Sequence, residues 1–127
     1  MNRALASLFF LFPSGPVFAQ ALHCRADFDE TSHYELSAVL SERGVDGKVG
    51  FRYLSEDGID LKSDLDPKSI VFVAGKTIKL SASNDSMAAS LQADAAASSG
   101  TYSGVLHVNF NLDNLSPVDV NADCTIR

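Results

Sequence analysis

Apolar and polar side chains alternate with a period of two along most of the chain that follows residue 21. Successive side chains of a β-strand point to opposite faces, so this alternation predicts strands with one face on a core and the other in water. Gly-rich turn signals separate several of the segments and predict hairpins between neighbours. The alternating segments lie within residues 22–28, 34–40, 49–53, 78–82, 106–112 and 118–126, and residues 70–73, which are apolar throughout, form a further expected strand.

The segment 86–96 fits two structures. Its alternating Met87, Ala89 and Leu91 predict a further strand, whereas its many alanines and the preceding polar residues would also suit a capped helix. We favour the strand, because Gly100 would then close a hairpin onto the next apolar segment. A helix would instead pack across one open end of the β structure.

Together these segments amount to about seven or eight short strands with turns at regular spacing. This pattern predicts an all-β fold, either a single small antiparallel β-sandwich or a barrel. The sequence contains no internal repeat and no long linker, and its length suits one domain. We therefore expect a signal peptide at residues 1–21 and one exported domain at residues 22–127.

The expected signal peptide rests on the composition of residues 1–21. A positive charge at Arg3 precedes an apolar run that is too short to span a bilayer. Ala19 and Ala21 supply the small residues that a signal peptidase recognises, and Val17 with Ala19 offers a second register two residues earlier. The sequence thus predicts export to a periplasm or to the extracellular space.

The chain has two cysteines, Cys24 and Cys124, one near each end of the expected domain. An even pair in an exported protein predicts a disulfide, here one that joins the two terminal strands. Acylation of Cys24 is the alternative, but His23 is too bulky for the position that precedes a lipidated cysteine.

The formal net charge of the chain is −6 at pH 7. An acidic protein repels nucleic acids and anionic membrane surfaces, so we expect no nucleic-acid partner. Residues 22–127 contain no apolar run of membrane-spanning length. We expect a monomer with an unknown protein partner, to which the charge would attract a cationic molecule.

The strongest concentration of charge lies between Glu56 and Asp66, which we interpret as an acidic loop with one brief edge strand. It forms a candidate surface for a protein partner. Its aspartates are also weak candidates for calcium ligands, although their spacing does not match an EF-hand. We expect no cofactor and no resident metal. The partner-surface residues are Glu56, Asp57, Asp60, Asp64 and Asp66, and the calcium candidates are Asp57, Asp60, Asp64 and Asp66.

No catalytic motif emerges from the remaining chemistry-bearing residues. His23, His33 and His107 lie opposite the apolar face of their segments, which predicts that all three are exposed. The chain has no Trp, and most of the seven aromatic residues after residue 21 are expected in the core. An enzyme would need histidines and carboxylates to converge in the fold, so we do not expect one.

Three functions follow as hypotheses. The leading one is an exported non-catalytic binding or accessory protein whose ligand is unknown. The first alternative is an inhibitor of a cationic secreted or periplasmic hydrolase that binds through the acidic loop. The second is a structural subunit or adhesin-like surface component that assembles through exposed strand edges.

Overall fold

The computed structural model describes residues 19–98, 100–112 and 115–127, and within these ranges it contains eight β-strands and no helix. None of the described segments forms an apolar helix long enough to cross a membrane. The strands are β1 (Gln20–Asp27), β2 (Ser32–Ser41), β3 (Gly44–Ser55), β4 (Asp60–Val73), β5 (Thr77–Ser83), β6 (Met87–Ala95), β7 (Thr101–Phe110) and β8 (Val118–Ile126).

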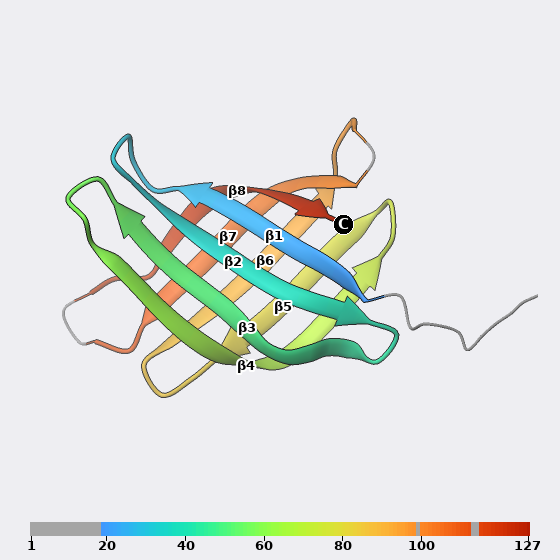
Figure 1. Ribbon diagram of the computed structural model, residues 1–127, viewed down its shortest axis with the longest axis horizontal. Helices are drawn as coiled ribbons and strands as arrows, with labels where there is room; N and C mark the ends of the chain where they lie inside the picture. Colours follow the sequence, from blue (N-terminus) through green and yellow to red (C-terminus); the bar gives the residue numbers. More distant parts are fainter. Residues whose placement is uncertain (1–18, 99, 113–114) are drawn as a thin grey trace, which may run out of the picture.

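The eight strands close into an antiparallel barrel (Figure 1). Each strand pairs with the next one in the sequence, and β8 pairs with β1 to complete the ring. The all-β prediction is confirmed, and of the two architectures that it allowed the chain adopts the barrel. The segment 86–96 is a strand, as we favoured, and it forms a hairpin with β7 across the turn that contains Gly100.

The two ends of the barrel differ in their connections. Loops 28–31, 56–59, 84–86 and 111–117 connect the strands at one end, which we call the loop end. The other three connections, 42–43, 74–76 and 96–100, lie at the opposite end, which we call the turn end. The first and last strand residues also lie at the turn end, which is on the right in Figure 1. The two ends of the barrel are therefore distinguishable by their connections.

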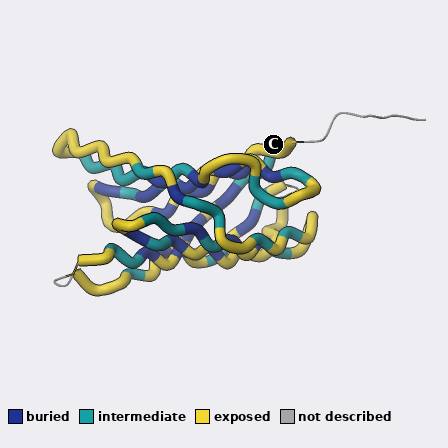
Figure 2. The backbone as a smooth tube through the Cα atoms, turned by 90° about the horizontal axis from the view of Figure 1, so that it is seen from below, coloured by how far each residue is buried: buried dark blue, intermediate teal, exposed yellow. Residues whose placement is uncertain are grey.

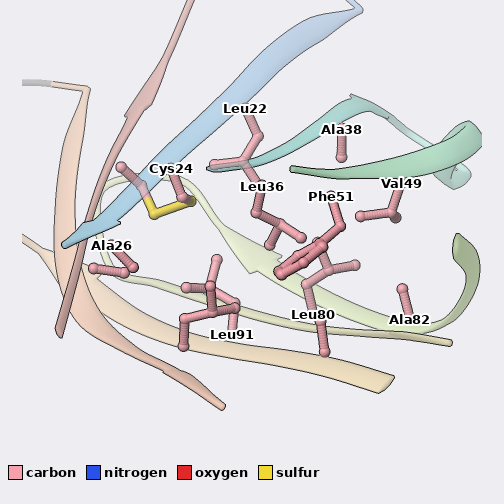
Figure 3. Packing of buried hydrophobic residues seen from close by; sticks show 14 of the residues in the cluster. Leu22, Cys24, Ala26, Leu36, Ala38, Val49, Phe51, Leu80, Ala82 and Leu91 are labelled. Atoms are coloured by element: carbon pink, nitrogen blue, oxygen red, sulfur yellow. A yellow bond between two sulfur atoms is a disulfide. The ribbon is translucent and has the colours of Figure 1, made fainter. Parts of the chain in front are cut away.

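The core lies inside the barrel, where the inward side chains of every strand meet (Figures 2 and 3). The alternation predicted from the sequence appears as alternating burial, most regularly in β1, β5 and β6. Branched apolar residues supply most of the bulk. The largest fully buried aliphatic side chains are Leu22, Leu36, Leu65, Ile78, Leu106, Val49 and Val108.

The predicted disulfide between Cys24 and Cys124 is present. The two residues are direct cross-strand partners in the β1–β8 ladder, and both are buried. The bridge therefore locks the closure of the barrel from inside.

The N-terminal strand begins before the expected end of the signal peptide. Residues 1–18 lie outside the described residues, but β1 already includes Gln20 and Ala21. Ala21 exchanges two backbone hydrogen bonds with Arg127, of 2.8 and 3.0 Å. The hydrogen bonds between the start of β1 and the C-terminal residue thus depend on Ala21, which we assigned to the signal peptide.

The acidic stretch is not a loop. Only residues 56–59 connect strands, and everything from Asp60 to Val73 belongs to the fourteen-residue strand β4. This strand changes partner along its length: residues 60–65 pair with β3, and residues 66–73 pair with β5, with an irregularity between Pro67 and Ser69. The full strand was not predicted because most of β4 faces solvent, so its charged residues show no regular alternation with apolar ones.

Gly104 in β7 allows an unusually close approach of the backbone to β6. A Cβ atom on Gly104 would lie 1.9 Å from the carbonyl oxygen of Gln92, far inside any real contact. The absence of a side chain at this position therefore sets how tightly β6 and β7 curve around the core.

Candidate functional site

An apolar cavity of about 410 Å³ opens at the loop end of the barrel. Its volume lies within the range of sites that hold small molecules. Five of its thirteen lining residues are aromatic, although the chain has only seven aromatic residues in its described ranges. The lining residues are Phe28, Tyr34, Phe51, Tyr53, Leu61, Ser63, Ser86, Met87, Phe110, Leu112, Leu115, Ser116 and Val118.

The aromatic rings form one connected cluster around Tyr34. Its ring centroid lies 5.3 Å from that of Phe51, 5.5 Å from that of Tyr53 and 5.7 Å from that of Phe28. Phe110 extends the cluster from the opposite side, 6.3 Å from Phe51. The cause is local: Tyr34 and Tyr53 are cross-strand partners of β2 and β3, and Phe51 points inward two residues before Tyr53.

The cavity has a buried floor and an exposed rim. Tyr34, Phe51 and Met87 are almost fully buried, with 5% or less of their surface accessible. The rim residues keep 45 to 61% of their surface in water, an exposure that is costly for side chains of this kind. These rim residues are Phe28, Leu61, Leu112 and Leu115. An apolar occupant would cover them.

The polar groups of the lining are all hydroxyls. Ser63, Ser86 and Ser116 contribute one each, and Tyr34 and Tyr53 contribute the others. Burial raises the pKa of Tyr34, and the neighbouring Tyr53 raises it further, so this phenol stays neutral. No lining residue is a carboxylate, imidazole, amine or thiol. The cavity can bind an apolar group and offer it hydrogen bonds, but its lining provides no acid–base pair.

Two of the surrounding loops are fixed by side-chain caps. In the loop 84–86, the Asn84 side-chain oxygen accepts hydrogen bonds from the amides of Ser86 and Met87, at 2.8 and 3.0 Å. Its Nδ2 donates to the carbonyl oxygen of Asp64 on β4, at 3.1 Å. In the loop 28–31, Asp29 accepts from the backbone and hydroxyl groups of Thr31 and Ser32. These bonds hold the rim in place without a ligand.

The five carboxylates proposed as a partner surface do not form one site. Glu56 and Asp57 lie in the loop 56–59, whereas Asp60, Asp64 and Asp66 are spread along β4. Asp60 receives two hydrogen bonds from Arg52, of 2.7 and 2.8 Å, and Asp66 pairs with Lys48. These cations lower the pKa of Asp60 and of Asp66.

The calcium candidates share this separation. In the part of the chain that the structure describes, no three His, Cys, Asp or Glu side chains are grouped so that they could hold a metal ion. Asp57, Asp60, Asp64 and Asp66 therefore do not come together as a ligand set, because a strand spaces its outward side chains along one line.

The three histidines lie on the outer wall of the barrel. His23 and His107 are about half exposed, but the His33 side chain is only 18% exposed, so the prediction that His33 is exposed is wrong. His33 is less exposed because its Nε2 lies 2.9 Å from the Glu35 carboxylate, which holds the ring against the wall. His107 contacts Asp119. Neither pair lines the apolar cavity.

Comparisons of the chain with protein-family models, with curated proteins and with solved structures found no match. The interpretation of the site therefore rests on its own geometry.

The cavity was not predicted from the sequence, because most aromatic residues were expected in the core. Period-two alternation identifies inward positions but does not tell a packed middle from an open end. One signal was available: Phe28, Tyr34, Tyr53 and Phe110 all lie within three residues of a connection at the loop end. Tyr102 and Phe72 form a separate pair outside the cavity.

Proposed function

We propose that this protein is an exported binding protein that takes a small apolar molecule into the cavity at the loop end. The observation that carries the proposal is the combination of a buried aromatic floor with an exposed apolar rim in one 410 Å³ space. Exposed apolar side chains gathered around a concavity are typical of ligand sites. A non-catalytic role fits a lining that contains only apolar and hydroxyl groups.

Export is the second part of the proposal. The disulfide supports it, because such bonds persist in oxidising compartments. The start of β1 at Gln20 favours cleavage after Ala19 over cleavage after Ala21, since the later cut would remove the hydrogen bonds between Ala21 and Arg127.

The two alternative functions gain less support. The inhibitor hypothesis needs a continuous acidic surface from Glu56 to Asp66, and two of those five carboxylates are neutralised by Arg52 and Lys48. The adhesin hypothesis needs a free edge on a terminal strand, and β1 and β8 use their edges on each other. We therefore favour the small-molecule site.

The direct test is a titration with N-phenyl-1-naphthylamine, a neutral dye whose fluorescence rises in apolar surroundings. We expect saturable binding with a stoichiometry of one. Two of the three tyrosines line the cavity, so a change in tyrosine emission gives a second readout.

A matched pair of variants locates the bound dye. Ser63→Phe would fill the cavity from β4, whereas Ser69→Phe adds the same ring to an exposed position of β4 outside the cavity. We expect Ser63→Phe to weaken dye binding by about tenfold or more, equivalent to losing the burial of roughly two methylene groups, and Ser69→Phe to leave it unchanged. Equal binding by both variants, or no saturable binding by the unmodified protein, would refute the proposal.

A further inference from the structure

The connections at the loop end carry charge of one sign only. Their described residues include five carboxylates and no Lys, Arg or His. The connections at the turn end carry one carboxylate and two cations, Glu42, Arg43 and Lys76. The loop-end carboxylates are Asp29, Glu30, Glu56, Asp57 and Asp85. Negative charge is thus concentrated at the end of the barrel where the cavity opens.

These five carboxylates are not neutralised within the described chain. None of them takes part in an ion pair among the residues that the structure describes. The amide and hydroxyl of Thr31, together with the Ser32 hydroxyl, lower the pKa of Asp29, so this group stays ionised. The other four are exposed loop residues. A cation that approaches the mouth is therefore attracted, and an anion is repelled.

The lining of the cavity restricts the kind of cation. Its aromatic faces attract positive charge through the ring quadrupole, within about 6 Å of a ring centre. It offers no carboxylate, however, so a primary ammonium group would lose strong hydrogen bonds to water on entry. A quaternary ammonium group has no N–H to satisfy and is weakly hydrated, so it loses much less.

We propose that the cavity selects apolar organic cations of the quaternary ammonium class over neutral molecules of the same shape. This inference rests on the proposed function and specifies its ligand. The apolar part of the ligand lies against Phe51, Tyr34 and Met87. The ammonium group lies among the outer rings, in the electrostatic field of the loop-end carboxylates.

The test uses two probes of nearly identical shape, 3-hydroxyphenyltrimethylammonium and 3-tert-butylphenol, which differ in the charge of one atom. Each competes with N-phenyl-1-naphthylamine at a pH where both phenols are protonated. We expect the cation to bind about tenfold more tightly, in line with a cation–π contact that is partly removed from water. We also expect added sodium chloride to reduce this preference.

Two double variants test whether the loop-end carboxylates cause the preference for the cation. Glu56→Gln with Asp57→Asn removes two charges at the loop end, and Glu42→Gln with Asp94→Asn removes two exposed charges at or near the turn end. We expect the first variant to reduce the preference by at least about threefold and the second to retain it.

The outcomes separate the two proposals. If the dye and the neutral phenol bind but the cation has no advantage, the inference is overturned and the small-molecule site remains. If both double variants lose the preference equally, the net charge of the protein and not the loop-end carboxylates is responsible, and this result also overturns the inference. Displacement of the dye by oligolysine, which carries no aromatic ring and no quaternary ammonium group, would instead identify the loop end as a surface for cationic proteins and would overturn the inference. Failure of dye and both probes to bind would refute the proposed function itself.

Discussion

Cys24 and Cys124 face each other across the β1–β8 ladder, with their Cα atoms 4.0 Å apart although they are separated by 100 positions in the sequence. Pairing two strands that are far apart in the sequence requires closing a long loop. The entropy cost of loop closure rises with loop length, so this contact is among the most costly to form. The disulfide removes that cost by keeping the two terminal strands together.

Replacement of both cysteines by serine should therefore lower the free energy of unfolding by about 4 to 5 kcal/mol, the chain-entropy value for a loop of this length. Urea unfolding monitored by circular dichroism measures the loss. Reduction of the unmodified protein should reproduce it, and a reductant should have no effect on the double variant. A loss below about 1 kcal/mol would mean that the ladder closes well without the bridge.

Gly104→Ala should destabilise the barrel by about 3 kcal/mol, because the new methyl group would meet the backbone of Gln92 and Ala93, which cannot move aside. Gly50→Ala is the matched control. Its methyl group would meet only the hydroxyl of Ser37, which can rotate away, so we expect a cost below about 1 kcal/mol. Equal losses in the two variants would show that backbone contact at Gly104 is not the cause.

The stability should decline in acid partly through Glu35. The hydrogen bond with His33 lowers the pKa of this carboxyl, and the charges of His23, His33 and Arg52 lower it further against a smaller opposing effect of burial. A pKa that is lower in the folded state means that the stabilisation is fully present above the unfolded value of about 4.3 and is lost as the pH falls below it.

Thermal unfolding between about pH 6 and pH 3 tests this, with Glu35→Gln as the variant. We expect Glu35→Gln to flatten the acid limb of the curve, whereas Glu42→Gln, in an exposed turn, should leave the limb unchanged. An identical acid limb in unmodified protein and Glu35→Gln would contradict the assignment.

Intact-mass measurement of the protein from its native host should give a mature chain that starts at Gln20. The reason is that β1 begins there and that Ala21 pairs with Arg127. A chain that starts at Leu22 would support the other cleavage register, and retention of residues 1–19 would contradict export by a cleaved leader.

Strands could be predicted from the sequence where one face of the strand is buried and the other is exposed to solvent. Segments such as 22–28 and 78–82 alternate cleanly, so their strands, their inward faces and the bridge between Cys24 and Cys124 could all be predicted. The ambiguous segment 86–96 resolved as a strand because Met87, Ala89 and Leu91 bury one side of it.

Sequence analysis failed where this contrast is absent. β4 carries charges and exposed apolar residues together, so Asp60 to Val73 gave no clean period and its charged half was taken for a loop. The cavity was missed for a different reason. Tyr34 and Phe51 are inward residues by pattern, and only the three-dimensional closure of the barrel reveals that they lie at an open end.

Gln20, where β1 begins, and Arg127 lie together at the turn end, on the far side of the barrel from the aromatic cavity (Figure 1). A bead, a fused domain or a surface tether attached at either of these residues would therefore be joined to the turn end of the barrel. The mouth would then point away from the attachment toward the surrounding fluid.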